Sequence, residues 1–383
     1  MRSIFSAFYS GNRDDMNAHF LRNVFIKGLL IFLVFNLAFA ALPPKLGKLS
    51  LYNHLLSGRE RLPFGEDSSK SYNLSLLDLD AMFAAHILTA GEKTPDEYRV
   101  IALGDSSVWG TLLRPQETLA GQLNAAALTV CGRRVRVYNL GYPTISLTKD
   151  LMILEQARRY QPDSILWGLT LEAFPLEKQV DSPLVANNPA RVDELIARYA
   201  LPLSPADPAL VRPNFWARTL IGQRRALADL LRLQLYGVLW SATGIDQIYP
   251  TDYAPAQTDF DSESTYHGQS GAPLEASRLA WSMLQAGIKA AAPTPLILFN
   301  EPMLISAGKN SGLRYNFFYP RWAYDQWRAQ MAQQAQANAW NYLDLWNLVP
   351  PTQFTNSAIH LTPNGEHLLA TQLGHIIQEQ PCP

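Results

Sequence analysis

The sequence predicts an α/β domain in three layers, with a central parallel five-stranded sheet covered by helices on both faces. Two observations lead to this fold class. Short, mostly apolar runs of five or six residues, typical of buried parallel strands, occur along the chain. They alternate with longer segments of helical spacing. Such alternation builds right-handed βαβ units, which place helices on both faces of a parallel sheet.

The predicted elements follow one another in a regular order. The strands are expected at 98–103, 135–140, 164–169, 295–299 and 340–345. The helices are expected at 116–129, 147–160, 274–291, 321–339 and 363–378.

A long stretch, 173–273, interrupts the alternation of strands and helices. It is rich in proline and aromatic residues and too long for a plain loop. We therefore expect an insertion in a domain of 97–380, and we expect it to be partly helical over 189–200 and 216–240.

The N-terminal part of the chain predicts a membrane anchor. Residues 24–42 are 19 almost entirely apolar residues, close to the roughly 20 that cross a bilayer. Arg22 and Lys27 flank the inner side, so the positive-inside rule places 1–23 in the cytoplasm and the remaining domain outside. The stretch 43–96 is then a membrane-proximal lead-in.

A secretory signal peptide is the alternative for the same segment. Ala38-Phe39-Ala40 fits a cleavage site of the A-x-A type. The region before the cleavage site is long for a signal peptide, so we favour an uncleaved anchor. Both interpretations export the domain.

Composition excludes some classes of function. The net charge is −1 and no run of Lys and Arg occurs, so the chain lacks the basic stripe that nucleic-acid binding needs. With only Cys131 and Cys382, paired-cysteine metal sites are excluded too. An extracytoplasmic disulfide between the two is one interpretation. We favour the other, in which Cys131 packs as a small hydrophobe and Cys382 lies on a frayed tail.

The first candidate site is Gly104-Asp105-Ser106-Ser107-Val108-Trp109-Gly110, directly after the first strand. Ligands of parallel sheets bind where strand carboxyl ends meet the following loops. A serine placed there between glycines can expose its hydroxyl and offer its own N–H to an oxyanion. The alternative is that Asp105-Ser106-Ser107 only caps the next helix.

The second candidate site is His360, in a loop just before the last helix. A serine is a weak nucleophile until a base within hydrogen-bonding distance takes its proton. Histidine titrates in the useful range. A single histidine is more often structural, but its pairing with the Ser106 segment favours a base.

These motifs resemble those of the SGNH/GDSL hydrolase family. Residues 104–110 resemble its first block, with Ser106 as nucleophile, and Asn139-Leu140-Gly141 resembles its second, with Gly141 as oxyanion donor. His360 matches the histidine of the fifth block. The resemblance covers 97–172 and 273–379, about half of the chain. It implies a three-layer, flavodoxin-like fold.

The chain departs from the family pattern at two positions. Thr170 stands where the third block has an asparagine that donates to the oxyanion, and Asn300 is a further candidate for that donor. Ser357 stands where the fifth block has an aspartate, three residues before the histidine. Asn356 is the candidate to orient the imidazole through its side-chain oxygen.

The resemblance implies a membrane-tethered serine esterase that acts outside the cytoplasm on an acyl ester of a carbohydrate or envelope glycan. One alternative is acyl transfer to a cell-envelope polysaccharide by the same residues, as in membrane-anchored bacterial relatives of alginate O-acetylation and teichoic-acid D-alanylation. Another is a non-catalytic binding or assembly module, which the two departures favour. No cofactor or metal is implied, and protein partners are not identified.

Overall fold

A six-stranded sheet forms the centre of the domain in a computed structural model that describes residues 11–42, 58–64, 77–243, 253–271, 273–380 and 382. The strand order is β2-β3-β1-β4-β5-β6, and every neighbouring pair is parallel except β2 and β3. The strands are β1 (Glu97–Leu103), β2 (Thr129–Val130), β3 (Arg133–Asn139), β4 (Ser164–Leu169), β5 (Leu296–Asn300) and β6 (Asn341–Asp344).

The predicted parallel sheet of five strands is confirmed, with one addition. Strand β2 is a two-residue antiparallel edge strand that begins at the last residue of the helix predicted over 116–129. That helix, α5, is shorter than predicted and spans Leu119–Ala125. After α5 the chain forms β2 and turns back into β3, with which β2 pairs. No periodicity in the sequence indicated this pairing.

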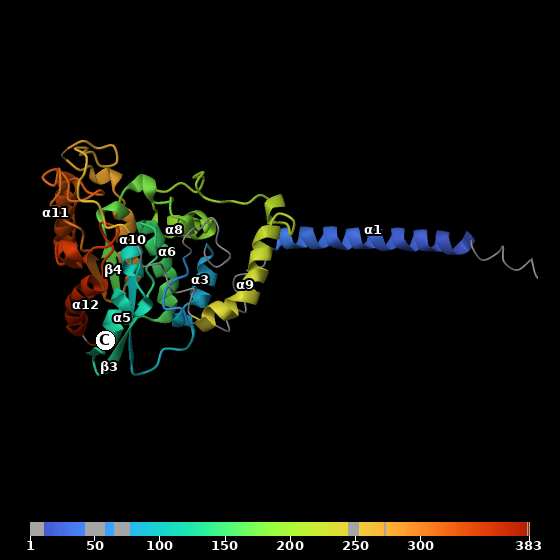
Figure 1. Cartoon of the computed structure of the whole chain (residues 1–383), viewed down its shortest axis with the longest axis horizontal. Coiled ribbons are helices and arrows are strands. Elements are labelled where there is room, and N and C mark those ends of the chain that lie inside the picture. The colour runs from blue at the N-terminus through green and yellow to red at the C-terminus, as the bar shows by residue number, and fades with distance from the viewer. Residues whose placement is uncertain are drawn as a thin grey trace, which may run out of the picture.

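Helices cover both faces of the sheet (Figure 1). Helices α6 and α10 pack together on one face, while α5 and α12 pack together on the other. The predicted three layers are therefore present. The helices of the domain are α3 (Leu79–Ala85), α4 (Ser106–Trp109), α6 (Leu147–Ala157), α7 (Pro183–Ala186), α8 (Pro189–Tyr199), α9 (Arg224–Thr243), α10 (Trp281–Ala291), α11 (Arg321–Asn338) and α12 (Pro363–Gln378).

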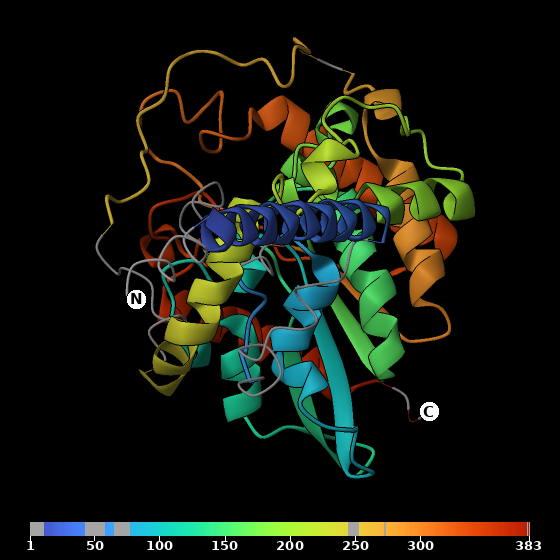
Figure 2. The same ribbon diagram turned by 90° about the vertical axis from the view of Figure 1, so that its right-hand side faces the viewer.

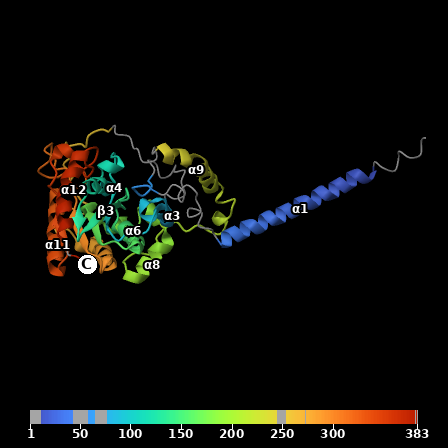
Figure 3. The same cartoon turned by 90° about the horizontal axis from the view of Figure 1, so that it is seen from below.

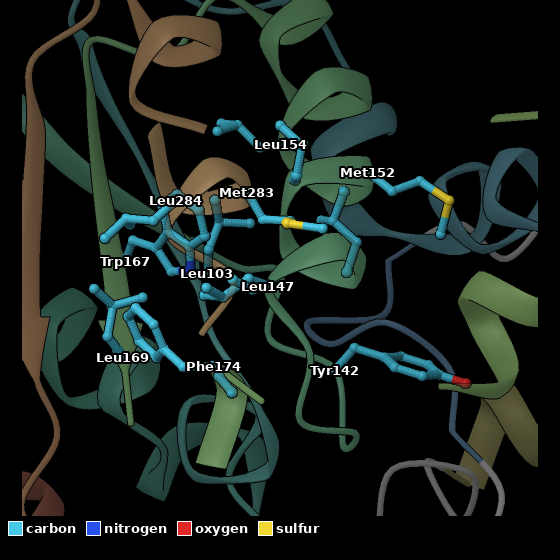
Figure 4. Packing of buried hydrophobic residues seen from close by; sticks show 14 of the residues in the cluster. Leu103, Tyr142, Leu147, Met152, Leu154, Trp167, Leu169, Phe174, Met283 and Leu284 are labelled. Atoms are coloured by element: carbon cyan, nitrogen blue, oxygen red, sulfur yellow. The ribbon is translucent and has the colours of Figure 1, made fainter. Parts of the chain in front are cut away.

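Alternation along the strands divides the core between the two faces. In β1, Ile101 and Leu103 belong to the cluster under α6 and α10, whereas Val100 and Ala102 belong to the cluster under α5 and α12. Figure 4 shows Trp167 of β4 beside Leu284 on the first of these faces. Trp167 is fully buried, so its truncation to alanine is expected to cost about 3–5 kcal/mol.

Helix α6 forms where the sequence has both a cap and an apolar stripe. Ser146 accepts a hydrogen bond from the N–H of Lys149 and so caps the helix. Leu147, Leu151 and Leu154 recur at helical spacing and are fully buried. The α-helix ends at Ala157 and continues only as a 3₁₀ turn to Tyr160, so it is shorter than the predicted 147–160.

The insertion 173–273 is partly helical, as predicted. Helix α8 matches the expected helix at 189–200. Helix α9 begins at Arg224 rather than at 216, because Trp216–Arg218 form a separate 3₁₀ turn before it. Figure 3 places α9 on the side of the domain from which α1 projects, and α11 and α12 on the opposite side.

The described parts of the stretch predicted as a lead-in, 58–64 and 77–96, pack against the domain. Leu62 and Met82 are fully buried in its core. Arg61 is buried as well, and its guanidinium donates to the carbonyls of Gly110 and Leu113 at 2.9 and 3.0 Å. These contacts hold the end of α4 in place.

Cys131 and Cys382 form a disulfide, which corrects the favoured interpretation of two unpaired cysteines. Cys131 lies between β2 and β3, and Cys382 follows α12. Helix α12 packs against α5 and β2, and this packing brings the C-terminal segment to the turn after β2. The sequence separation of 251 positions between the cysteines concealed this proximity.

Helix α1 (Gly11–Ala41) projects from the domain as one continuous helix (Figure 1). Its segment Asn17–Ala41 has 25 residues and, among the helices in the described parts of the chain, is the one long and apolar enough to cross a membrane. A helix of this length is roughly 37 Å long, more than the ~30 Å of a hydrocarbon core.

Candidate active site

The loop after β1 places Ser106 at the carboxyl end of a central strand. Gly104 has φ +156°, and a Cβ atom there would lie 2.5 Å from Val108 Cγ2, so the turn requires glycine. Helix α4 begins at Ser106 itself. Asp105 caps it by accepting a hydrogen bond of 2.8 Å from the N–H of Ser107. The loop therefore does both things that its sequence suggested: Asp105 caps α4, and Ser106 lies at the sheet edge.

Ser106, His360 and Asn356 form a hydrogen-bonded row. The Oγ atom of Ser106 lies 2.7 Å from His360 Nε2, and Nδ1 of the same ring lies 2.8 Å from Asn356 Oδ1. An amide oxygen only accepts hydrogen bonds, so Nδ1 carries the proton. Nε2 is then left with a free lone pair and accepts from the Ser106 hydroxyl. This tautomer is the one that a general base needs.

Burial keeps the His360 imidazole neutral. It lowers the pKa of His360 from its ordinary 6.5 to about 4. At neutral pH the ring therefore has a lone pair available for the serine proton.

Backbone hydrogen bonds fix the loop that carries His360. Thr355 donates to the carbonyl of His360 from its N–H at 2.9 Å and from its hydroxyl at 3.2 Å. Phe354 and Leu361 form an antiparallel bridge across the base of this loop. The resulting tight loop directs the side chain of Asn356, four residues before the histidine, to Nδ1. Ser357, three residues before the histidine, does not make this contact.

Gly141 lies against α4, but its amide has a partner within its own turn. A Cβ atom at Gly141 would lie 2.5 Å from the backbone nitrogen of Trp109, so only glycine fits. The N–H of Gly141 donates to Asn139 Oδ1 at 3.0 Å, and Asn139 Nδ2 donates to the carbonyl of Val108 at 2.8 Å. Asn139 thereby joins the loop after β3 to the loop after β1. The oxyanion role of Gly141 stays a prediction.

Thr170 and Asn300 lie at the carboxyl ends of β4 and β5, and each is engaged elsewhere. The hydroxyl of Thr170 is hydrogen-bonded to the hydroxyl of Tyr319, which also accepts from the N–H of Glu172 at 3.4 Å. Asn300 donates to Asp344 on β6 at 2.8 Å and accepts from a tyrosine on α11 at 3.0 Å. The side chain of Asn300 is therefore directed toward β6 and α11. No feature of the sequence indicated Tyr319.

A fully buried lysine connects the two loops beneath the site. Lys149 Nζ donates to the carbonyl of Gly104 at 2.7 Å and to that of Tyr142 at 3.1 Å. Its charge is balanced by Asp150, 2.7 Å away. Burial raises the pKa of Asp150, and the positive charge of Lys149 opposes that rise. In the sequence, Lys149 and Asp150 look like an ordinary charged pair at the start of a helix.

The carboxyl group of Glu301 occupies space left by glycine next to these loops. A Cβ atom at Gly168 would lie 2.3 Å from Glu301 Oε1. Burial, reinforced by the nearby negative charge of Asp105, raises the pKa of Glu301 well above its ordinary value. Ser107, Glu301 and Glu366 line a small cavity here.

A second cluster lies where the insertion meets the end of β4. Glu172 is hydrogen-bonded to Lys178 and to His267, whose Nε2 lies 3.1 Å from Glu172 Oε2. Burial acts to raise the pKa of Glu172, but the hydrogen bonds from these two side chains hold the pKa below its ordinary value. These contacts give Glu172 a structural role where the insertion joins the sheet.

No metal-binding group of three or more His, Cys, Asp and Glu side chains occurs in the part of the chain that the structure describes. The fold and the site thus define a class: a three-layer α/β protein with a hydrogen-bonded Ser–His–Asn row at the carboxyl edge of its sheet.

Among known proteins, similarity to this chain is found with solved structures. No protein-family model matches the chain, and no curated protein matches it. One similar solved structure is a member of the lipolytic protein G-D-S-L family from Veillonella parvula, with 10% identity over 74% of this chain and 99% of that one and a TM-score of 0.35. Another is a carbohydrate acetylesterase family member from Sinorhizobium meliloti, with 10% identity over 73% and 96% of the two chains and a TM-score of 0.33.

Proposed function

We propose that this chain is a serine ester hydrolase of the SGNH/GDSL type, with Ser106 as nucleophile, His360 as general base and Asn356 as the group that orients the base. The observation that carries this proposal is the row of two hydrogen bonds, 2.7 and 2.8 Å long, that joins the three side chains. The alternative of a non-catalytic module is disfavoured, because a neutral, correctly oriented imidazole on a serine hydroxyl serves no evident packing purpose.

The proposed reaction has two halves. Ser106 Oγ attacks the carbonyl carbon of the ester while its proton passes to His360 Nε2. The tetrahedral intermediate collapses, the alcohol leaves with that proton, and an acyl group stays on Ser106. Water then attacks the acyl group with His360 again as base, which releases the carboxylic acid and restores the serine hydroxyl.

One backbone N–H in this arrangement is available to donate a hydrogen bond to the oxyanion. The N–H of Ser106 begins α4 and, among the hydrogen bonds of the described residues, donates none. We assign the second donor to Gly141, whose N–H then shares its proton between Asn139 and the oxyanion. One donor of this kind typically contributes about 10²–10³ in kcat.

We further propose that α1 holds the domain outside the cytoplasm as an uncleaved membrane anchor. The length and composition of Asn17–Ala41 support this. The Cys131–Cys382 disulfide supports it independently, because disulfides persist in oxidising compartments and are rare in the cytosol. The substrate class that we infer is an acyl ester of a carbohydrate or envelope glycan. It follows from the family resemblance together with this location.

Labelling with a fluorophosphonate probe, together with turnover of p-nitrophenyl acetate, tests the proposal. Wild-type protein is expected to label and to turn over, whereas Ser106→Ala and His360→Ala lose both. Ser107→Ala is the matched control, since it removes the adjacent hydroxyl and leaves the row intact. Labelling or turnover that survives in Ser106→Ala contradicts the proposal.

Hydrolysis and acyl transfer differ only in the acceptor, water or a glycan hydroxyl. Mass analysis of the products with and without an added oligosaccharide separates them. Free acid in both samples supports the esterase, while an acylated oligosaccharide shows that the same residues perform transfer.

A further inference from the structure

Helix α9 has an exposed apolar side that no other described element covers. Leu231, Leu235 and Leu239 recur at intervals of four residues and therefore share one side of the helix. Their exposed fractions are 66, 73 and 63%. Leu233, on the other side of the helix, is buried, with 1% of its surface exposed. A solvent-exposed apolar stripe of this kind marks an interaction site.

The segment just before α9 is joined to the outer end of α1. The N–H of Ile221 donates to Asn36 Oδ1 at 3.2 Å, and the turn Trp216–Arg218 packs against α1. Asn36 and Ala40 are buried and Phe39 is half-buried, whereas the large apolar side chains from Phe20 to Phe35 are exposed. Asn36 is five residues before the end of α1, so Ile221 lies roughly 7–8 Å from that end along the helix axis.

The contact between Ile221 and Asn36 determines the depth at which the start of α9 meets a bilayer. With α1 as the span, its last turns lie in the boundary between acyl chains and headgroups, and Ile221 lies there with them. Figure 1 shows α9 between the body of the domain and the length of α1. Figure 2, which faces the side from which α1 projects, shows α9 on the near side of the domain.

The charge and the aromatic residues of this segment match an anionic lipid surface. Residues 215–239 contain four arginines and one aspartate, a net charge of +3. Asp229 is paired with Arg232 at 2.8 Å, while Arg224 and Arg225 are exposed. Trp216 has 73% of its surface exposed next to the contact with α1, where tryptophan favours a membrane interface. A leucine face bordered by arginines is typical of helices that lie in the interfacial plane.

We propose that residues 215–239 form an interfacial membrane-docking segment. In this arrangement Leu231, Leu235 and Leu239 enter the headgroup and acyl boundary of the outer leaflet, and Arg224 and Arg225 contact the phosphates of anionic phospholipids. The insertion then gives the domain a second attachment beside α1, which fixes its orientation over the bilayer. The inference rests on the proposed anchoring by α1 and is independent of the esterase chemistry.

Nitroxide accessibility in lipid nanodiscs tests the docking. Both native cysteines are in the disulfide, so Leu235→Cys introduces a single free thiol for labelling in the full chain. Asn338→Cys, at the exposed end of α11 on the opposite side of the domain, is the matched control. We expect the label at position 235 to gain collisions with oxygen and to lose collisions with the water-soluble complex NiEDDA several-fold relative to position 338.

Lipid charge gives the second arm of the experiment. The protection at position 235 is expected to increase when phosphatidylglycerol is added to phosphatidylcholine nanodiscs. Arg224→Gln with Arg225→Gln is expected to remove this dependence. Arg158→Gln with Arg159→Gln, an exposed arginine pair elsewhere, is expected to keep it.

Three results would overturn the proposal. The first is equal NiEDDA accessibility at the two labelled positions. The second is protection from both reagents without a gain in oxygen collisions, as a second copy of the chain would produce. The third is loss of the chain from the nanodisc, which removes the anchor itself. Turnover of p-nitrophenyl acetate, measured on the same samples, reports the proposed esterase separately.

Discussion

Replacing Asn356 with aspartate is expected to convert the Ser–His–Asn row into a site with a carboxylate behind the base. Asn356 Oδ1 lies 2.8 Å from His360 Nδ1, so an aspartate oxygen in its place keeps the hydrogen bond and adds a negative charge. At a separation of about 4 Å between charge centres and an effective dielectric constant of about 20, the attraction to an imidazolium is about 4 kcal/mol. This corresponds to about 3 pKa units.

The consequence appears in the pH profile of turnover. The pKa of His360 is about 4 in the native chain, so kcat/KM is expected to fall as pH drops through about 4. In Asn356→Asp the acid limb is expected to move to about pH 7, and kcat above that pH to rise by up to about 10³, because the imidazolium forms in the transition state.

The assay is hydrolysis of p-nitrophenyl acetate from pH 3 to pH 9, with initial rates corrected for the uncatalysed reaction. Asn338→Asp adds the same charge at an exposed site and is expected to leave the profile unchanged. An acid limb that stays near pH 4 in Asn356→Asp, at an unchanged rate, would refute the assignment of Asn356 as the group that orients His360.

Three further predictions concern stability. Burial raises the pKa of Glu366 from 4.5 to about 8, so the folded state retains a proton that the unfolded state loses, and stability falls as pH rises from about 4.5 to 8. The free energy of unfolding of Glu366→Gln, measured with urea, is therefore expected to exceed that of wild type by up to about 5 kcal/mol at pH 9 and to equal it near pH 4.5. Urea unfolding curves that coincide at pH 9 contradict this. Lys149→Met removes the cation that pairs with Asp150, which then retains a hydrogen bond from Trp167 Nε1, and the change is expected to cost about 3–5 kcal/mol, with a fall in kcat that the stability loss alone does not explain. Reduction of the Cys131–Cys382 disulfide, which closes a 251-residue separation, is expected to lower stability by about 5 kcal/mol in the chain-entropy model, and an unchanged urea midpoint in dithiothreitol would argue against that cross-link.

The strands and most of the long helices of the domain could be predicted because each depends on local patterns. Strand β4 is found at 164–169 and helix α12 at 363–378, as predicted. Apolar continuity marks a strand that is buried on both faces, and a threonine cap followed by proline marks the start of a helix. Strand β2 was missed although its partner β3 follows it closely in the sequence. A strand of two residues is too short to show the alternation that marks a strand, and only its pairing with β3 defines it.

The candidate site divides in the same way. Ser106 and His360 were identified from their local motifs at the ends of predicted strands and helices. Asn356 was also named from the sequence as the candidate that orients the ring. Its contact with the ring nevertheless depends on the shape of the loop over 354–361, which sequence spacing does not specify. Asn300 could not be excluded as a donor from its position alone, because its direction depends on hydrogen bonds from β6 and α11.

By itself, the sequence determined the order of strands and helices, the apolar N-terminal span and the positions of a serine and a histidine at the sheet edge. These properties follow from periodicity, turn residues and connection lengths, which act over a few residues. The tertiary structure alone decided which side chains meet: the 2.7 Å contact between Ser106 and His360, the buried Lys149 that joins two loops, and the Cys131–Cys382 pair. Their partners are separated by 254, up to 45 and 251 residues, so only the packing of the whole domain brings them together.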